Sequence, residues 1–324
     1  MGHERREGRG SRLTRSNRVG ACLSETTGTG EEDTLASTRE IRRRIRSVRN
    51  ISQITRAMEM VAASKMRRAQ QRVLASRPYA ERLEEMIGDL AALNLDVDGA
   101  AAFPLLAHRE VKKIAVLLVT PDKGLTGPLN SNIMRRAGRF VLTEAEAPVQ
   151  VVTVGRKGRD FMIRTRQEVV AEFSNLKDTV EAAEILPITD VIIDDYVSGR
   201  VDAVYLIYPK FVNTLSQVPT VHKLLPIDPP EASGKYSDYI FEPNAKEVLN
   251  NLLPRLVDTQ IYQAILENFA SEYSARMVAM RNASENAKDL VSDLTLTYNK
   301  ARQTQITAEV SEISAGANAQ RERS

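Results

Sequence analysis

The chain has 324 residues, enough for one or two domains, and its apolar fraction of 42% and charged fraction of 27% are those of ordinary soluble proteins. No stretch of about 18 apolar residues occurs and the amino-terminal segment has no apolar core, which argues against a membrane span and a secretory signal. The single cysteine, Cys22, excludes an internal disulfide and a multi-cysteine zinc site. The net charge of +3 indicates little by itself, whereas its distribution along the chain is informative.

Residues 1–35 are rich in Gly, Arg and Thr and have no hydrophobic periodicity, so we interpret them as a disordered extension. One hypothesis is that Leu35 is the native start and that the segment before it is misassigned. A mass spectrum of the native amino terminus tests this hypothesis, and a peptide covering residues 11–34 would contradict it.

A first long helix is predicted over residues 36–95. Ser37 or Thr38 is expected to cap it, with Glu40 placed for a capping box. Pro78 predicts a kink or a break, after which a helical pattern resumes at Tyr79. Apolar and small residues recur every three or four positions in a heptad-like seam, which includes Ile41, Ile45, Val48, Met58, Ala62, Met66, Ala69 and Val73.

The middle of the chain alternates between short apolar runs and helical patterns, which predicts an open α/β domain over residues 110–230. Residue 219 is a proline, and it places the last of the predicted strands at an edge of the sheet. A linker rich in Pro, Ser, Gly and Tyr follows over residues 226–243. The predicted strands are 113–119, 149–154, 203–208 and 217–225, and the predicted helices are 130–145, 156–166 and 189–198.

A second long helix is predicted over residues 244–319, with Pro254 kinking its first turns or starting its main part. About 75 helical residues would span roughly 110 Å, more than the diameter of a domain of this size, so we expect the helix to project beyond its own fold. Beyond about Thr295 its apolar face gives way to Ala, Thr, Gln and Ser. We therefore expect other chains to surround that end.

The first long helix is strongly basic, with eleven Lys or Arg against two acids between Ala36 and Arg72. Three interpretations remain open at this point. The face could bind nucleic acid phosphates, although no base-stacking aromatic residue interrupts the run. It could be an ordinary solvated face, or it could be a basic stalk that faces acidic loops of a partner.

Residues suited to catalysis are scarce. The glycine pairs Gly124/Gly127 and Gly155/Gly158 follow predicted strands but complete no phosphate-binding motif, so we interpret them as tight turns and the nearby Asp122 and Lys123 as structural or interface residues. The three histidines lack metal-ligand spacing, and Asp194 and Asp195 are expected on a solvated helix face. We expect no catalytic residue, no metal and no cofactor.

The two ends of the chain carry long motifs that resemble the gamma subunit of F-type ATP synthases. The resemblance covers about residues 36–319 and is loosest in the middle. The motifs are Arg39-Glu-Ile-Arg-Arg-Arg-Ile-Arg46, Gln53-Ile-Thr-Arg-Ala-Met-Glu-Met-Val-Ala-Ala-Ser-Lys-Met-Arg-Arg-Ala-Gln70, Tyr298-Asn-Lys-Ala-Arg-Gln303 and Ile306-Thr-Ala-Glu-Val-Ser-Glu-Ile-Ser-Ala-Gly-Ala-Asn-Ala319.

This resemblance implies an antiparallel coiled coil of the two terminal helices with a Rossmann-like α/β domain between them in sequence. It implies a rotor shaft inside a ring of alpha and beta subunits, with the epsilon subunit and the proton-driven c-ring at the globular end. It also implies a peripheral position on the cytoplasmic face of a bacterial cell membrane. Gamma subunits bind no nucleotide and carry no catalytic residue.

Five positions of this chain match partner-contact positions of the family. The resemblance implies that Arg302 and Gln303 touch the catch loops of the catalytic subunits, that Met58 lies near an acidic loop of beta, and that Thr307 and Glu309 affect coupling. Thr126 stands where many members have Cys, and Pro128 stiffens the same turn. The paired cysteines of the light-regulated chloroplast form are absent from the sequence, so thiol control of that kind is not expected.

Two functions of other classes remain as alternatives to the rotor shaft. A basic coiled-coil nucleic-acid-binding protein predicts salt-sensitive binding to duplex DNA. A nucleotide-dependent enzyme on the central sheet predicts saturable nucleotide binding by that domain.

Overall fold

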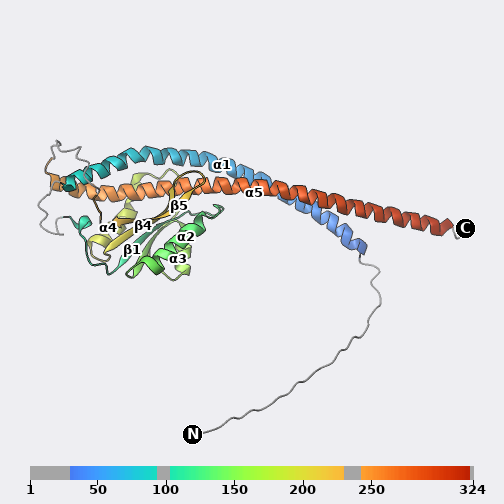
Figure 1. Ribbon diagram of the computed structural model, residues 1–324, viewed down its shortest axis with the longest axis horizontal. Coiled ribbons are helices and arrows are strands. Elements are labelled where there is room, and N and C mark those ends of the chain that lie inside the picture. Colours follow the sequence, from blue (N-terminus) through green and yellow to red (C-terminus); the bar gives the residue numbers. More distant parts are fainter. Residues whose placement is uncertain (1–29, 93–102, 230–241, 322–324) are drawn as a thin grey trace, which may run out of the picture. The chain divides into compact units, whose positions relative to one another are not determined.

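The computed structural model describes residues 30–92, 103–229 and 242–321 (Figure 1). The predicted extension falls mostly outside them, as do residues 93–95 at the end of the first predicted helix and most of the linker before Pro243. The described chain divides into two compact units. One holds the described residues up to Ile45 and those from Asp293 onward, and the other is Arg46–Ser292.

A five-stranded mixed sheet forms the centre of the larger unit, in the order β3-β2-β1-β4-β5. The first four strands are mutually parallel, and β5 pairs antiparallel with β4 at the edge, as Pro219 predicted. The strands are β1 (Ile114–Val119), β2 (Val149–Val154), β3 (Glu168–Phe173), β4 (Ala203–Phe211) and β5 (Gln217–Leu225).

Both faces of the sheet are covered, which explains why the strand β1 is a continuous apolar run. Ile114, Val116 and Leu118 pack with α2 (Leu129–Arg139) and α3 (Arg156–Arg164). Ala115, Leu117 and Val119 join a larger core that includes α4 (Leu186–Val197) and the two long helices. Short helical turns complete the unit at η1 (Pro104–Leu106), η2 (Phe140–Glu144) and η3 (Ala182–Glu184).

The two long helices are α1 (Gly30–Ala92) and α5 (Ala245–Arg321), each continuous over its whole length. Inside the larger unit they contact each other at Ser52 and Ser284, whose hydroxyl oxygens lie 3.4 Å apart, and at Glu59 and Arg281, which form a 2.9 Å ion pair. In the smaller unit, the Arg42 guanidinium lies 5.2 Å from the ring centroid of Tyr298. Within the larger unit the α5 partner moves to lower numbers as the α1 number rises, so the pair is antiparallel as predicted.

Neither proline ends its helix, so a break at Pro78 is wrong, and so is a start of the second long helix at Pro254, because α5 begins at Ala245. A proline inside a helix costs about 3 kcal/mol because it removes a hydrogen bond and crowds the preceding turn. Burying an aliphatic side chain contributes about 1.5–3 kcal/mol. Val73, Leu83 and Ile87 are all almost fully buried around Pro78, so packing offsets the cost.

Three other features of the structure differ from the prediction. The first helix begins at Gly30, so Ser37 and Thr38 lie inside it and are not its cap. The pattern at 130–145 is the helix α2 followed by the π-helical turn η2. The strand β3 was not predicted at all, and its side chains alternate between exposed and half-buried.

Candidate functional site

The five residues matched to partner-contact positions belong to different units of the chain. Met58 lies half-buried on α1 in the larger unit. Arg302, Gln303, Thr307 and Glu309 are all exposed on α5 in the smaller unit. The hydrogen bonds recorded for these four are local to the helix. Thr307 Oγ1 donates to the carbonyl of Gln303 at 2.9 Å, and a Glu309 carboxylate oxygen accepts from Gln305 Nε2 at 3.0 Å.

The end of α5 carries exposed apolar side chains. Every residue from Ile306 to Arg321 is exposed. Ile306, Val310 and Ile313 have 47%, 57% and 72% of their surface exposed, and their spacing of four and three places them on one helix face. A stripe of this kind on a helix is typical of a surface that binds another chain.

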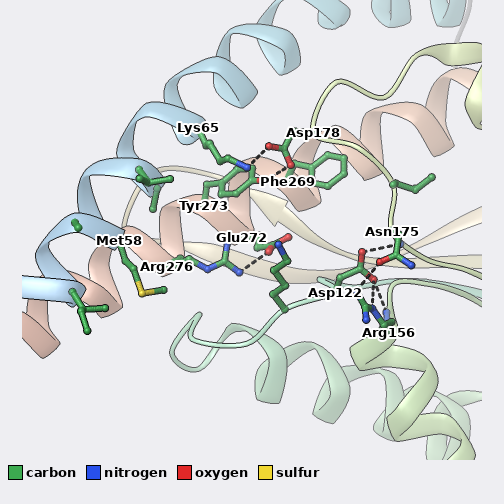
Figure 2. A pocket seen from close by; sticks show the side chains of 16 residues that line it. Met58, Lys65, Asp122, Arg156, Asn175, Asp178, Phe269, Glu272, Tyr273 and Arg276 are labelled. Carbon is green, nitrogen blue, oxygen red and sulfur yellow. Dashed lines mark hydrogen bonds and ion pairs between the residues drawn. The ribbon is translucent and has the colours of Figure 1, made fainter. Parts of the chain in front are cut away.

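Met58 lines a pocket of about 580 Å³ in the larger unit (Figure 2). The pocket lies between α1, α5 and the loops that follow β1 and β3, and much of its wall is apolar, including Ile54, Val61 and Phe269. Val61 is 57% exposed and Ile54 is 59% exposed, so α1 presents apolar surface beside Met58. The volume lies in the range of ordinary ligand pockets.

Polar side chains join the walls of this pocket. Asp178, in the loop after β3, accepts hydrogen bonds from Lys65 on α1 and from the hydroxyl of Tyr273 on α5. Burial opposes the charged form of Asp178, but these two bonds outweigh it and hold the pKa of the carboxyl below its ordinary value. Burial together with the neighbouring Asp178 raises the pKa of Tyr273, so its hydroxyl stays a donor.

A buried ion pair lies next to Tyr273 on α5, between Glu272 and Arg276. The Arg276 guanidinium contacts the Glu272 carboxylate at 2.6 Å and donates to the carbonyl of Gly124 at 3.2 Å. Burial raises the pKa of Glu272, although Arg276 opposes this. The pair therefore fastens α5 to the loop after β1.

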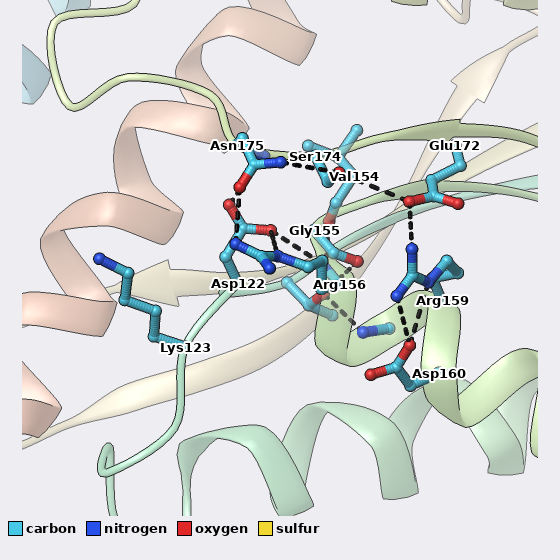
Figure 3. A network of polar contacts seen from close by, with 12 residues as sticks. Asp122, Lys123, Val154, Gly155, Arg156, Arg159, Asp160, Glu172, Ser174 and Asn175 are labelled. Carbon is cyan, nitrogen blue, oxygen red and sulfur yellow. Dashed lines mark hydrogen bonds and ion pairs between the residues drawn. The ribbon is translucent and has the colours of Figure 1, made fainter.

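The glycine turn after β2 has its backbone donors occupied by side chains of the same chain (Figure 3). The carboxylate of Asp122 accepts the backbone N–H of Arg156 at 2.9 Å, and Thr120 Oγ1 accepts that of Gly158 at 2.9 Å. These N–H groups at the start of α3 are the ones that would hold a phosphate. Gly155 has a φ of +99°, and a Cβ there would lie 2.0 Å from the Thr120 carbonyl oxygen, so the glycine serves a close turn. The interpretation as a tight turn is confirmed for Gly155 and Gly158, and Asp122 accepts backbone hydrogen bonds from Arg156 and Asn175.

Asp195 is not on a solvated face, and that expectation is wrong. Its side chain is buried, accepts a hydrogen bond from Gln150 Nε2 on β2 at 2.7 Å and pairs with Arg200 at 2.6 Å. His108 Nε2 lies 3.1 Å from an Asp228 carboxylate oxygen. His222 is a residue of β5. Within residues 30–92, 103–229 and 242–321, no group of three His, Cys, Asp or Glu side chains is arranged to hold a metal ion.

Asp178 has no local signature in the sequence, because its partner Lys65 is 113 residues away and its partner Tyr273 is 95 residues away. Lys65 and Arg72 belong to the basic run of the first long helix. All nine other members of that run are exposed, namely Arg39, Arg42, Arg43, Arg44, Arg46, Arg49, Arg56, Arg67 and Arg68.

Comparison with known proteins decides among the interpretations. The family model described as ATP synthase matches residues 37–320, which include both long helices and the sheet between them. The chain belongs to the ATP synthase gamma chain family. The ATP synthase gamma chain of Roseiflexus castenholzii is 57% identical over 88% of this chain and 99% of the relative. That of Chloroflexus aurantiacus is 55% identical over the same shares.

Solved structures of the family share the fold. A chain in the central stalk and c-ring structure of the Tetrahymena thermophila mitochondrial ATP synthase has a TM-score of 0.55 and 26% identity, and the match covers 71% of this chain and 99% of that one. A chain in the rotor structure of the Euglena gracilis mitochondrial ATP synthase has a TM-score of 0.57 and 19% identity, covering 84% and 99%. At 19% identity, the likeness to the Euglena gracilis chain shows the fold alone. No helix within the described residues is long and apolar enough to cross a membrane.

Proposed function

We propose that the chain is the central shaft of a rotary ATP synthase, a non-catalytic subunit that couples rotation of a proton-driven c-ring to ATP synthesis or hydrolysis in an alpha/beta head. The relatives named above are ATP synthase gamma chains, and the matching chains of known structure belong to a central stalk and a rotor. The nucleic-acid alternative gains no support from these relatives.

One structural observation carries the proposal. The last described residues of α5, from Ile306 to Arg321, are exposed without exception, and they include the apolar stripe of Ile306, Val310 and Ile313. An isolated helical end with an exposed apolar stripe gains most of its stability from packing against something else. A ring of alpha and beta subunits around α5 would cover it.

The partner contacts follow from the same assignment. Arg302 and Gln303 would meet the catch loops of the catalytic subunits, where Arg302 can donate charge-assisted hydrogen bonds to a carboxylate. Thr307 and Glu309 would contribute to coupling, and Met58 would face an acidic loop of beta. The epsilon subunit and the c-ring would bind at the sheet-containing unit. The complex would hold the chain at the cytoplasmic face of a bacterial cell membrane.

Purification of the chain from native membranes tests the proposal. We expect an affinity tag on the chain to recover alpha, beta and epsilon subunits in a complex that hydrolyses ATP. A matched preparation of untagged membranes is the control. Recovery of the chain without those subunits and bound to nucleic acid would contradict the proposal.

A further inference from the structure

A single carboxylate connects both long helices to the sheet-containing part of the larger unit (Figure 2). One oxygen of Asp178 accepts from Lys65 on α1, and the other accepts from Tyr273 on α5. Arg72, two turns beyond Lys65 on α1, donates to the backbone carbonyl of Asp178. We name Lys65, Arg72, Asp178 and Tyr273 the Asp178 cluster.

The segment that carries Asp178, residues 174–181, is itself held to the sheet edge. We call this segment the strap. The backbone N–H of Asn175 donates to Asp122 at 2.9 Å, and Asp122 also accepts the N–H of Arg156 at the start of α3 (Figure 3). The hydroxyl of Tyr262 on α5 reaches the carbonyl of Val180 at 3.5 Å. Contacts therefore run from the ends of β1 and β2, through the strap, to both helices.

The chemistry of this position calls for a carboxylate. Each oxygen of an ionised Asp accepts hydrogen bonds, so the side chain serves an ammonium donor and a hydroxyl donor at once. An Asn offers one acceptor oxygen and one NH₂ donor, and the NH₂ group would face a second donor. Lys65 also lies 5.2 Å from the ring centroid of Tyr273, so the cation contacts both the carboxylate and the ring.

We propose that Asp178 is a positioning residue for torque transmission, which fixes the rotational position of the sheet against the paired helices α1 and α5. The proposal rests on the proposed function as a rotor shaft. Every contact that carries it lies within Arg46–Ser292. Contacts among the sheet, the strap and both helices oppose twisting of the sheet about the helices, together with the apolar core that they share. The side chain of Asp178 lies where the strap meets both helices.

The test measures torsional stiffness in the assembled complex. The alpha/beta head is immobilised and stalled with a non-hydrolysable nucleotide. A bead is attached through Arg164→Cys, on the exposed end of α3, in a chain whose single cysteine is replaced by Cys22→Ser. The angular variance of the bead is compared among the parent, Asp178→Asn and the control Glu144→Gln. Glu144 is exposed and forms a 2.8 Å ion pair with Arg136 of α2. This control therefore removes the same charge from another ion pair of the larger unit.

We expect Asp178→Asn to increase the angular variance and Glu144→Gln to leave it at the parent value. Hydrogen exchange of the strap amides should also accelerate by roughly 2–5-fold in Asp178→Asn, as expected when an ion pair between side chains that are 36% and 41% exposed is lost. Tyr273→Phe and Lys65→Met each remove one side of the cluster and should each increase the variance. The melting temperature of each complex is measured alongside, since a purely structural role would lower it without changing the variance.

Equal variance in the parent, Asp178→Asn and Glu144→Gln complexes would overturn the role of Asp178. That result would leave the rotor assignment standing, because the parent complex would still hold the chain in the head. Failure of the parent chain to join an alpha/beta head would instead overturn the proposed function.

Discussion

Buried carboxylates on α5 are the residues with the clearest energetic cost in this chain. Glu267 is 3% exposed and accepts the backbone N–H of Phe211 at 3.1 Å. Burial raises the pKa of Glu267, although its backbone hydrogen bond and the nearby Lys210 and Arg77 oppose this. Glu272, with its ion-pair partner Arg276, is less costly because the charge is paired.

Replacing Glu267 should stabilise the chain at neutral pH. Because its pKa in the folded chain is raised above the ordinary 4.5, the folded state binds more protons than the unfolded state between those two values, and the free energy of unfolding falls as pH rises through that window. Glu267→Gln keeps an acceptor for the Phe211 N–H and removes the charge. We expect a higher melting temperature than the parent at pH 7 and a smaller difference at pH 4.

The control for this comparison is Glu285→Gln, an exposed acid on the same helix. It should change the melting temperature little at either pH. A Glu267→Gln variant that melts below the parent at pH 7 would show that the ionised carboxylate is stabilising, against the expectation.

The residues of the site were only partly predictable. Met58, Arg302, Gln303, Thr307 and Glu309 were selected through long terminal motifs, and their partner contacts remain predictions. Asp178 has no local signature, because an ion pair between distant positions follows from the fold alone. Asp195 was misjudged for a related reason, since its partner Gln150 lies on a strand 45 residues earlier.

Among the elements, the strands β1, β2, β4 and β5 were predictable and the edge strand β3 was not. The strands β1 and β2 and the start of β4 are apolar runs, and Pro219 placed β5 at an edge. The strand β3, with the sequence EVVAEF, lies at the opposite edge with a half-exposed pattern and two acids, so a single sequence gives it little weight. The break at Pro78 was wrongly predicted because tertiary packing outweighs the local cost of a proline in a helix.

The exposed end of α5 is the element that should respond most directly to substitution in the complex. Arg302→Ala with Gln303→Ala should lower coupled ATP turnover roughly tenfold, because a hydrogen bond to a charged group contributes about 1.5–3 kcal/mol. The measurement is ATP synthesis and ATP-driven proton pumping in membrane vesicles. Arg321→Ala, which removes the same charge further along the helix, is the matched control and should have little effect.

Unchanged synthesis and hydrolysis in the double variant would contradict the role of Arg302 and Gln303 at the partner loops. It would leave the family assignment unaffected, because that assignment rests on the match over residues 37–320.

At the scale of the whole molecule, the two compact units contribute differently to the proposed rotor function. The unit Arg46–Ser292 holds the sheet against α1 and α5 through a shared apolar core and the Asp178 cluster. The smaller unit presents the exposed end of α5. The sheet has the topology of nucleotide-binding folds, yet its turn donors are occupied by Asp122 and Thr120.

Rotation of the chain inside its complex is the measurement that tests the central claim most directly. The alpha/beta head is fixed to a surface, a bead is attached through Arg164→Cys in the Cys22→Ser chain, and ATP is supplied. The account predicts that the bead turns continuously in one direction while ATP is hydrolysed, and that it stops when ATP is removed. A complex that hydrolyses ATP at its full rate while the bead stays at one angle would contradict the assignment of this chain as the rotor shaft.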